Sequence, residues 1–301
     1  MKKIILLLKK YIPNELYDSL VVFYVNKRTV FNENRLKNKI ISFHKNSKDE
    51  EILPIVDFLK NNKLEVFPYP FAKKYNKETI TVFENEENKL KYVLHQGKKL
   101  YFKRSMSIAH IKSLYQGLLF DQDENSPHLY LTETFQLNEN DVVADIGSAE
   151  GNFSLSNVEK VKKIYLFESD IEWIEALEET FKPWKEKVEI INYFVTDYDS
   201  SSTISIKTFY ENHDKITFFK VDIEGEEQNF LNSCKPVFEI EKNIKMAICT
   251  YHKQNDEHDF NQQLTQLGFD VEKSKGYMIF MHDQNLSAPY LRRGLLRAFK
   301  S

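Results

Sequence analysis

The chain has 301 residues, of which 42% are hydrophobic and 29% are charged, and this composition excludes a disordered or collagen-like protein. Its length corresponds to two domains of about 150 residues or one large domain. The formal net charge of -3 gives no overall basic surface, so nucleic acid is not an expected partner. Cys234 and Cys249 are the only cysteines and cannot form a disulfide framework, so we expect a reducing, cytoplasmic setting.

The first apolar run, residues 4–8, lies between two pairs of lysines. It is far shorter than the roughly 20 apolar residues that span a bilayer, and no signal-peptide cleavage site follows it. We therefore expect no transmembrane segment. A short element packed on the domain is the main interpretation of this run, and a basic amphipathic anchor on a membrane surface is the alternative.

The first third of the chain has mixed patterns that predict an N-terminal α+β region. Residues 50–61 have helical spacing, and residues 78–84 and 91–94 are rich in β-formers on either side of a polar stretch, which indicates a hairpin. We assign residues 1–105 to a substrate-binding or assembly region and residues 106–140 to a helical connector.

From residue 141 onward short apolar runs alternate with helical stretches, and we interpret residues 141–301 as one α/β domain. Such alternation predicts a mostly parallel sheet with helices on both faces, and ligands bind such sheets at the carboxyl ends of the strands, near the topological switch point. Strands are expected at 142–146, 164–167, 188–195, 216–221, 245–251, 269–271 and 277–281, and helices at 152–161, 171–181, from 226 to about 233, and at 259–267.

The first of these strands runs into a glycine-containing turn, Asp145-Ile146-Gly147-Ser148-Ala149-Glu150-Gly151-Asn152. Gly147 and Gly151 permit a tight turn and close approach to a ligand because they lack a Cβ. The next helix begins near Asn152, so its free N–H groups point into the same crevice. Glu168 ends the following strand, at a place where an acid can accept both hydroxyls of a ribose.

Two nucleotide ligands compete for this turn. A dinucleotide site has the pattern G-x-G-x-x-G, which presents bare backbone to a pyrophosphate, whereas this turn has G-x-x-x-G with Asp145 and Glu150 beside it. Two carboxylates repel a pyrophosphate but suit a ligand that carries an amino group and a sulfonium. Charge therefore favours S-adenosylmethionine over NAD, and a purely structural turn is the remaining alternative.

Three segments resemble the FkbM family of class I S-adenosylmethionine-dependent methyltransferases: residues 142–153, residues 166–168, and residues 220–227, whose sequence KVDIEGEE is similar to the family's K-x-D-x-E-G-x-E. The resemblance covers about residues 140–285. It implies a Rossmann-like, seven-stranded, mostly parallel sheet with an antiparallel last strand. It also implies O-methylation of a hydroxyl on a sugar, glycan or natural product. The proline that usually follows the second-strand acid is Ser169 here.

The resemblance also assigns cofactor-binding residues. It implies that Asp145, Gly147 and Gly151 surround the methionine part of S-adenosylmethionine, and that Glu168 binds the ribose. The remaining expected cofactor-binding residues are Ser148, Glu150 and Asn152 in the same turn, with Thr196 and Asp197 near the adenine. A simple turn role for Asp197 is the alternative.

Catalytic candidates follow the fourth and fifth strands. In a methyl transfer, positioning of the two reactants lowers the activation barrier by about 7–11 kcal/mol, and a general base lowers it by about 3–5.5 kcal/mol. Alignment of the reactants therefore matters more than a base. His252 is either a base oriented by Asp222 or, together with Asp222 and Glu224, a ligand of a divalent metal. Magnesium prefers the two carboxylates, and use of His252 favours a transition metal. The structural alternative is that Glu224 or Glu226 caps the N-terminus of the following helix and stabilises it through the helix dipole.

Two other functions remain open, a nicotinamide oxidoreductase and a non-catalytic nucleoside-binding scaffold in a glycan-assembly system. The expected partner is a small-molecule or glycan hydroxyl acceptor, whose identity the sequence does not predict, and the chain can be monomeric or oligomeric. His128 is a candidate acceptor-site residue. The basic residues at the C-terminal end are expected to form a solvated tail, with docking on an acidic glycan or membrane as the alternative; they are Arg292, Arg293, Arg297 and Lys300.

Overall fold

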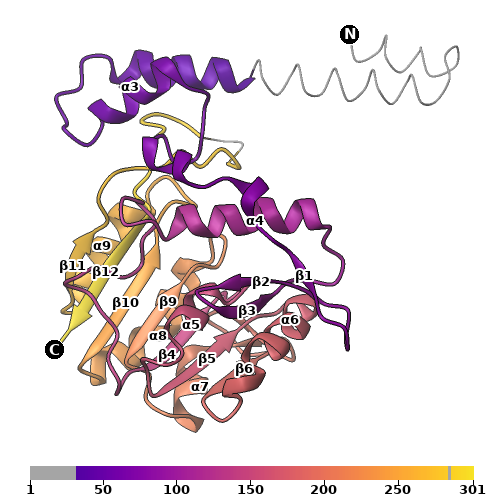
Figure 1. The fold of residues 1–301 in the computed structure, drawn as a ribbon. Helices are drawn as coiled ribbons and strands as arrows, with labels where there is room; N and C mark the ends of the chain where they lie inside the picture. The colour runs from indigo at the N-terminus through magenta and orange to yellow at the C-terminus, as the bar shows by residue number, and fades with distance from the viewer. Residues whose placement is uncertain (1–31, 284–285) are drawn as a thin grey trace, which may run out of the picture.

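The computed structural model describes residues 32–283 and 286–301. Its centre is a seven-stranded sheet with the order β11-β12-β10-β9-β4-β5-β6 (Figure 1). The five strands from β10 to β6 pair in parallel, and the last strand, β12, is antiparallel to both of its neighbours. The fold class expected from the sequence is therefore confirmed. The strands are β4 (Val142–Ile146), β5 (Lys163–Phe167), β6 (Val188–Ile191), β9 (Phe218–Val221), β10 (Ile244–Cys249), β11 (Asp270–Lys273) and β12 (Leu295–Lys300).

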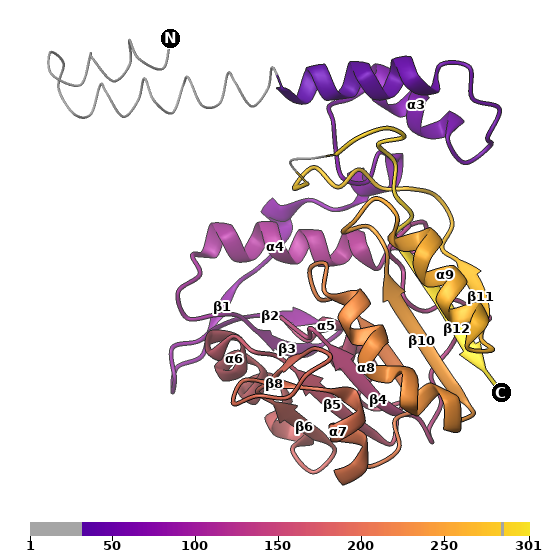
Figure 2. The ribbon, with the colours of Figure 1, turned by 180° about the vertical axis from the view of Figure 1, so that it is seen from behind.

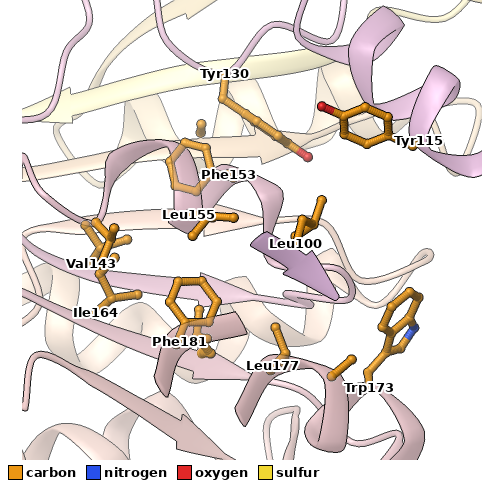
Figure 3. Packing of buried hydrophobic residues seen from close by; sticks show 14 of the residues in the cluster. Leu100, Tyr115, Tyr130, Val143, Phe153, Leu155, Ile164, Trp173, Leu177 and Phe181 are labelled. Carbon is orange, nitrogen blue, oxygen red and sulfur yellow. The ribbon is translucent and has the colours of Figure 1, made fainter. Parts of the chain in front are cut away.

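Helices cover both faces of this sheet, which explains why its central strands are mostly apolar. All five residues of β4 are buried, and alternate side chains of this strand belong to different cores. Val143 packs toward α5 (Asn152–Asn157) and α6 (Ile171–Phe181) (Figure 3). Ala144 packs in the cluster of the opposite face, which is covered by α7 (Ile206–Asn212), α8 (Glu227–Ile240) and α9 (Asp256–Gln266) (Figure 2).

The N-terminal region packs on this core through a small β-sheet and through a pair of helices. A three-stranded meander of β1 (Phe83–Glu84), β2 (Lys91–His95) and β3 (Lys98–Tyr101) lies against α6, where the Tyr101 amide donates to Thr180 Oγ1 at 3.0 Å. The predicted hairpin is confirmed by the antiparallel pairing of β1 with β2, and β3 adds a strand that was not predicted. From the meander the chain continues into α4 (Ile108–Asp121).

A helical pair, residues 32–44 and α3 (Leu53–Asn61), has a small core of its own. Ile40 and Ile55 of this pair are fully buried against Ile279 and Leu291 from the segment between β11 and β12. The apolar run at residues 4–8 lies outside the described residues. Among those that are described, the structure holds no helix with the length and apolar character needed to cross a bilayer.

The predictions of a strand at residues 277–281 and of a solvated basic tail are both wrong. The chain ends instead in β12, and Arg297 on this strand is only 3% exposed. Its guanidinium donates to the carbonyl oxygens of Leu129 and Tyr130 and pairs with Glu272 at 3.0 Å. A basic residue can therefore serve as a buried link between the sheet and the connector, provided that every donor has a partner.

Smaller differences concern element ends. The expected strand at 188–195 breaks after Ile191, and its remainder, β7 (Phe194–Val195), pairs with β8 (Thr203–Ile204). Helix α5 ends at Asn157 rather than at residue 161, α8 continues through Pro236, and α7 was not expected.

We expect Arg297→Ala to lower the free energy of unfolding by about 2–4 kcal/mol, because two buried carbonyl oxygens lose their donors. Urea denaturation measures this loss. The matched control is Lys185→Ala, which removes an exposed cation and should change stability by less than about 0.5 kcal/mol. Equal stabilities of the two variants would contradict the structural role of Arg297.

Candidate functional site

A cavity of about 480 Å³ lies at the carboxyl ends of β4, β5, β9 and β10. The chain runs from β4 toward β6 on one side and from β9 toward β10 on the other, so this is the topological switch point where α/β sheets bind ligands. A second cavity, of about 510 Å³, lies at the amino ends of β4, β9 and β10, beside Asp141 and Lys245. The first cavity is lined by Leu114, Leu118, Asp121, Gln122, His128, Tyr130, Ile146, Gly147, Ser148, Ala149, Glu150, Asn152, Phe167, Glu168, Ser169, Asp170, Trp173, Tyr193, Phe194, Val195, Lys220, Asp222, Ile223, Glu224 and Tyr251.

The two glycines of the turn after β4 are required by the protein's own packing. Both have a φ of +74°, and a Cβ on Gly147 would lie 2.0 Å from the Asp222 carbonyl oxygen. A Cβ on Gly151 would lie 2.7 Å from Leu177 Cδ2 of α6. Gly147 therefore lets the loops after β4 and β9 come into contact. Gly147 also lines the cavity, but Gly151 is not part of the cavity wall.

Asp145 lies behind this turn rather than in the cavity. Its carboxylate is fully buried, accepts from Ser154 Oγ at 2.7 Å and lies 3.0 Å from Lys220 Nζ. The Lys220 ammonium also donates to the Gly147 carbonyl oxygen at 2.7 Å. Burial works against the charge of Lys220, but the Asp145 and Asp222 carboxylates together outweigh it, so the pKa of the lysine is raised. The Asp145–Lys220 ion pair therefore supports the turn after β4.

Glu168 joins the turn after β4 to the turn after β5. One carboxylate oxygen accepts from the Ala149 amide at 2.9 Å and the other from the Asp170 amide at 2.8 Å. Its side chain also lines the cavity. Because a carboxylate has about four acceptor positions, each oxygen keeps one for a hydroxyl of the ligand.

The cavity is strongly acidic. Its lining contains six carboxyl groups, and of the lining residues, all within the described part of the chain, only Lys220 is a permanent cation. Burial raises the pKa of Glu150 to about 7 against the attraction of Lys220, and it raises the pKa of Asp121 to about 6. Such a cavity favours a cationic ligand. The acids are Asp121, Glu150, Glu168, Asp170, Asp222 and Glu224.

The remaining predicted cofactor residues divide between the cavity and its surroundings. Ser148 and Asn152 line it, but Thr196 and Asp197 do not. The strand break after Ile191 puts residues 193–195 on the cavity wall instead. Thr196 is buried, its amide donates to the Ile204 carbonyl oxygen at 3.2 Å, and Asp197 is exposed.

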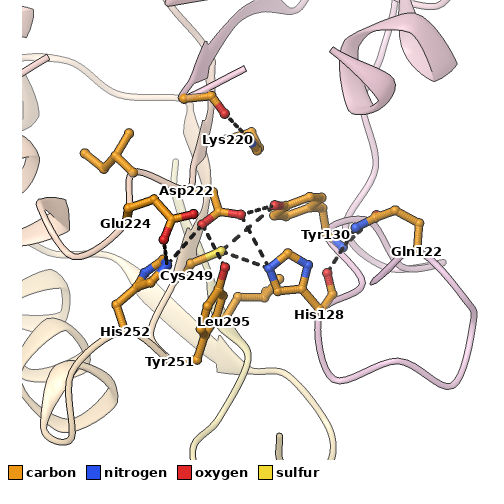
Figure 4. Close-up of polar contacts among 12 residues, drawn as sticks. Gln122, His128, Tyr130, Lys220, Asp222, Glu224, Cys249, Tyr251, His252 and Leu295 are labelled. Carbon is orange, nitrogen blue, oxygen red and sulfur yellow. Dashed lines mark hydrogen bonds and ion pairs between the residues drawn. The ribbon is translucent and has the colours of Figure 1, made fainter. Parts of the chain in front are cut away.

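Asp222 is the centre of a polar cluster that borders the cavity (Figure 4). The hydroxyls of Tyr130 and Tyr251 donate to its carboxylate at 3.0 and 3.1 Å, and Nε2 atoms of His128 and His252 lie 3.6 and 3.7 Å from it. Burial opposes ionisation, but these histidines and a nearby lysine outweigh it and hold the pKa of Asp222 well below its usual range. Asp222 is therefore a fixed anion rather than a base.

His252 is next to this cluster but does not line the cavity. Its Nδ1 lies 2.9 Å from Glu227 Oε1, and its Nε2 lies 3.6 Å from Glu224 Oε2. Burial alone would lower the pKa of the imidazole, but contact with Glu227 outweighs burial and raises it. The structure thus brings the three predicted catalytic residues together.

Several residues of the site were not singled out from the sequence. Asp121 ends α4, Gln122 follows it directly, and Tyr130 lies further along the connector. No local pattern distinguishes them, because they reach the cavity only through the packing of α4 across the sheet edge. Glu227 was the one with a signal, since it is the last acid of the K-x-D-x-E-G-x-E segment.

Comparison with known proteins identifies relatives of this arrangement. The family model for the "Methyltransferase FkbM domain" matches residues 69–277, whereas no curated protein sequence matches the chain. Among solved structures, the chain is similar to the methyltransferase FkbM from Methylobacillus flagellatus, with 14% sequence identity and a TM-score of 0.44 over 64% of this chain and 53% of that chain. The chain thus spans about half the length of that protein.

Two further solved structures are similar at low identity. Precorrin-6Y C5,15-methyltransferase from Geobacter metallireducens has 10% identity and a TM-score of 0.40, over 55% of this chain and 83% of that chain. An rRNA methylase from Streptococcus thermophilus has 14% identity and a TM-score of 0.38, over 55% of this chain and 89% of that chain.

We expect Asp145→Ala to lower the free energy of unfolding by about 3–5 kcal/mol, because it leaves the buried Lys220 ammonium without its partner. Chemical denaturation measures the loss. In the double variant Asp145→Ala/Lys220→Met both charges are gone, and its stability should recover most of the difference. A single variant as stable as the parent protein would mean that the pair does not hold the turn.

The pKa of Glu150 predicts a pH dependence of cation binding. Between pH 6 and pH 8 the ionised fraction of a group with a pKa of about 7 increases about tenfold, so the affinity for a cationic nucleoside should increase by about the same factor. Calorimetric titration with S-adenosylmethionine across this range measures it. Glu150→Gln should bind with a flatter profile, and an unchanged profile would place the titrating group elsewhere.

Proposed function

The chain belongs to the FkbM methyltransferase family, and on this premise we propose that it transfers the methyl group of S-adenosylmethionine to a hydroxyl of a sugar, glycan or other natural product. The observation that carries the proposal is the acid-lined cavity at the switch point of the sheet. Six carboxyl groups face a space of about 480 Å³, which lies in the usual range of small-molecule sites.

The cofactor fits the part of the cavity between the turns after β4 and β5. A sulfonium and an ammonium are stabilised by the acids of this cavity, among which Glu150 belongs to the turn after β4. The free acceptor positions of Glu168 suit the ribose hydroxyls, and the wall at residues 193–195 supplies apolar contact for the base. Asp145 and Gly151 support this part of the site from behind.

The acceptor fits the other end of the cavity, beside Asp222. Methyl transfer is an in-line displacement in which the acceptor oxygen, the methyl carbon and the sulfur are collinear, and alignment supplies most of the rate. Asp222, fixed by Tyr130 and Tyr251, orients the acceptor hydroxyl by accepting its hydrogen bond. His128, which is buried on the same wall, contributes to orientation there.

The charge of the cavity also bears on the alternatives. A dinucleotide brings two phosphate charges and a nucleic acid brings many, and both are repelled by this lining. The two cysteines are buried and unpaired, which supports a reducing, cytoplasmic setting. A scaffold without activity would bind the nucleoside but never consume it, so turnover separates that function from the one proposed.

Calorimetric titration tests the proposal directly. We expect S-adenosylmethionine and its demethylated product to bind, NAD to fail, and Glu168→Ala to weaken cofactor binding more than tenfold, or about 1.4 kcal/mol. Glu178→Ala, an exposed acid on the outer face of α6, is the matched control and should bind as the parent protein does. Tight binding of NAD without S-adenosylmethionine would overturn the proposal. Transfer of label from methyl-labelled cofactor to a panel of sugars and glycans then identifies the acceptor.

A further inference from the structure

The side chain of His252 is surrounded by carboxylates from one segment of the chain. Glu227 lies on the Nδ1 side of the ring at 2.9 Å, and Asp222 and Glu224 lie on the Nε2 side at 3.7 and 3.6 Å. One ligand atom each from Asp222, Glu227 and His252 lies within 4.8 Å of the others. Three acids therefore converge on one imidazole.

Hydrogen bonding within the protein does not satisfy this group. His252 is 7% exposed. Its Nδ1 faces Glu227, but its Nε2 has no hydrogen-bond partner. Oε2 of the fully buried Glu227 has none either, while its Oε1 accepts from the Ile223 amide at 3.0 Å. Buried polar groups without partners are rare in proteins and often indicate an ion or a water.

We propose that His252 Nε2, Asp222 and Glu224 bind a divalent transition-metal ion, with Glu227 orienting the imidazole from behind. Two atoms that are each about 2.1 Å from one ion and are separated by 3.6 or 3.7 Å subtend about 120° at that ion, which suits a low-coordinate site. A carboxylate behind a ligating histidine is the usual support of such a ligand. One nitrogen and two oxygens favour Mn²⁺, Fe²⁺, Co²⁺ or Zn²⁺ over Mg²⁺.

The position of the site gives the ion a role that rests on the proposed function. Asp222 and Glu224 line the acceptor end of the cavity, so an ion between them and His252 would lie beside the acceptor hydroxyl. A bound ion acidifies such a hydroxyl and thereby lowers the need for a general base. Metal binding itself does not depend on this role.

A neighbouring group competes for the same ion. Asp222 also faces His128 and Cys249, whose Nε2 and Sγ are 3.3 Å apart, and a thiolate is a strong ligand for zinc. The thiol of Cys249 is fully buried, and its contact with His128 already gives that ring nitrogen a partner. For this reason the observations favour His252.

Titration of the chelator-treated full chain with Co²⁺ tests the proposal, with binding followed by the visible absorption of the metal. We expect one equivalent to bind without a sulfur-to-metal charge-transfer band. His252→Ala and Glu224→Ala should each weaken Co²⁺ binding at least tenfold, and Glu227→Gln about 10–100-fold. The Glu224 side chain is 87% exposed, so its removal tests the site without disturbing the fold. His110→Ala, an exposed histidine on α4, is the control.

Three results would overturn the proposal. They are no Co²⁺ binding, retention of binding in both His252→Ala and Glu224→Ala, and loss of binding in Cys249→Ser together with a charge-transfer band. S-adenosylmethionine is titrated into the metal-free protein in parallel. Cofactor binding without Co²⁺ binding would refute the metal site alone, whereas Co²⁺ binding without cofactor binding would refute the proposed function alone.

Discussion

A buried ion pair joins the two central strands at the point where the cavity begins. Asp145 of β4 and Lys220 of β9 are direct partners in the register of the sheet, and their charged groups lie 3.0 Å apart. Because the Lys220 ammonium also holds the Gly147 carbonyl oxygen, the sheet register sets the shape of the turn. This turn positions the Ala149 amide on Glu168, so the end of the cavity beside Glu168 depends on the Asp145–Lys220 pair.

The other end of the cavity depends on a second charge, that of Asp222. Two tyrosine hydroxyls and two imidazoles surround this carboxylate, and they come from the connector and from the loop after β10. A buried carboxylate is costly unless donors compensate it, so the ionised Asp222 requires these segments to converge. The same requirement explains why the connector crosses the sheet edge and is tied down by Arg297 of the last strand.

The predictable part of the fold was the part with local signals. Runs such as residues 142–146 are apolar except for Asp145 because both faces of the strand are covered, and glycines at 147 and 151 are needed where the chain packs so closely. The strand from Leu295 to Lys300 escaped prediction because its arginine and lysine resemble a solvated tail, and only tertiary partners reveal that Arg297 is buried. Thr196 and Asp197 were predicted near the adenine, and they do not line the cavity because the strand before them breaks after Ile191, which no residue pattern marks.

If the cavity binds S-adenosylmethionine as proposed, the raised pKa of Glu150 links that binding to the release of a proton. Near neutral pH about half of the molecules hold a proton on this carboxyl, and an arriving sulfonium favours its departure. Binding of the cationic cofactor then releases a proton from Glu150, and the surrounding buffer takes up this proton. The heat of association would consequently vary with the ionisation enthalpy of the buffer, although the contacts in the cavity are the same in each.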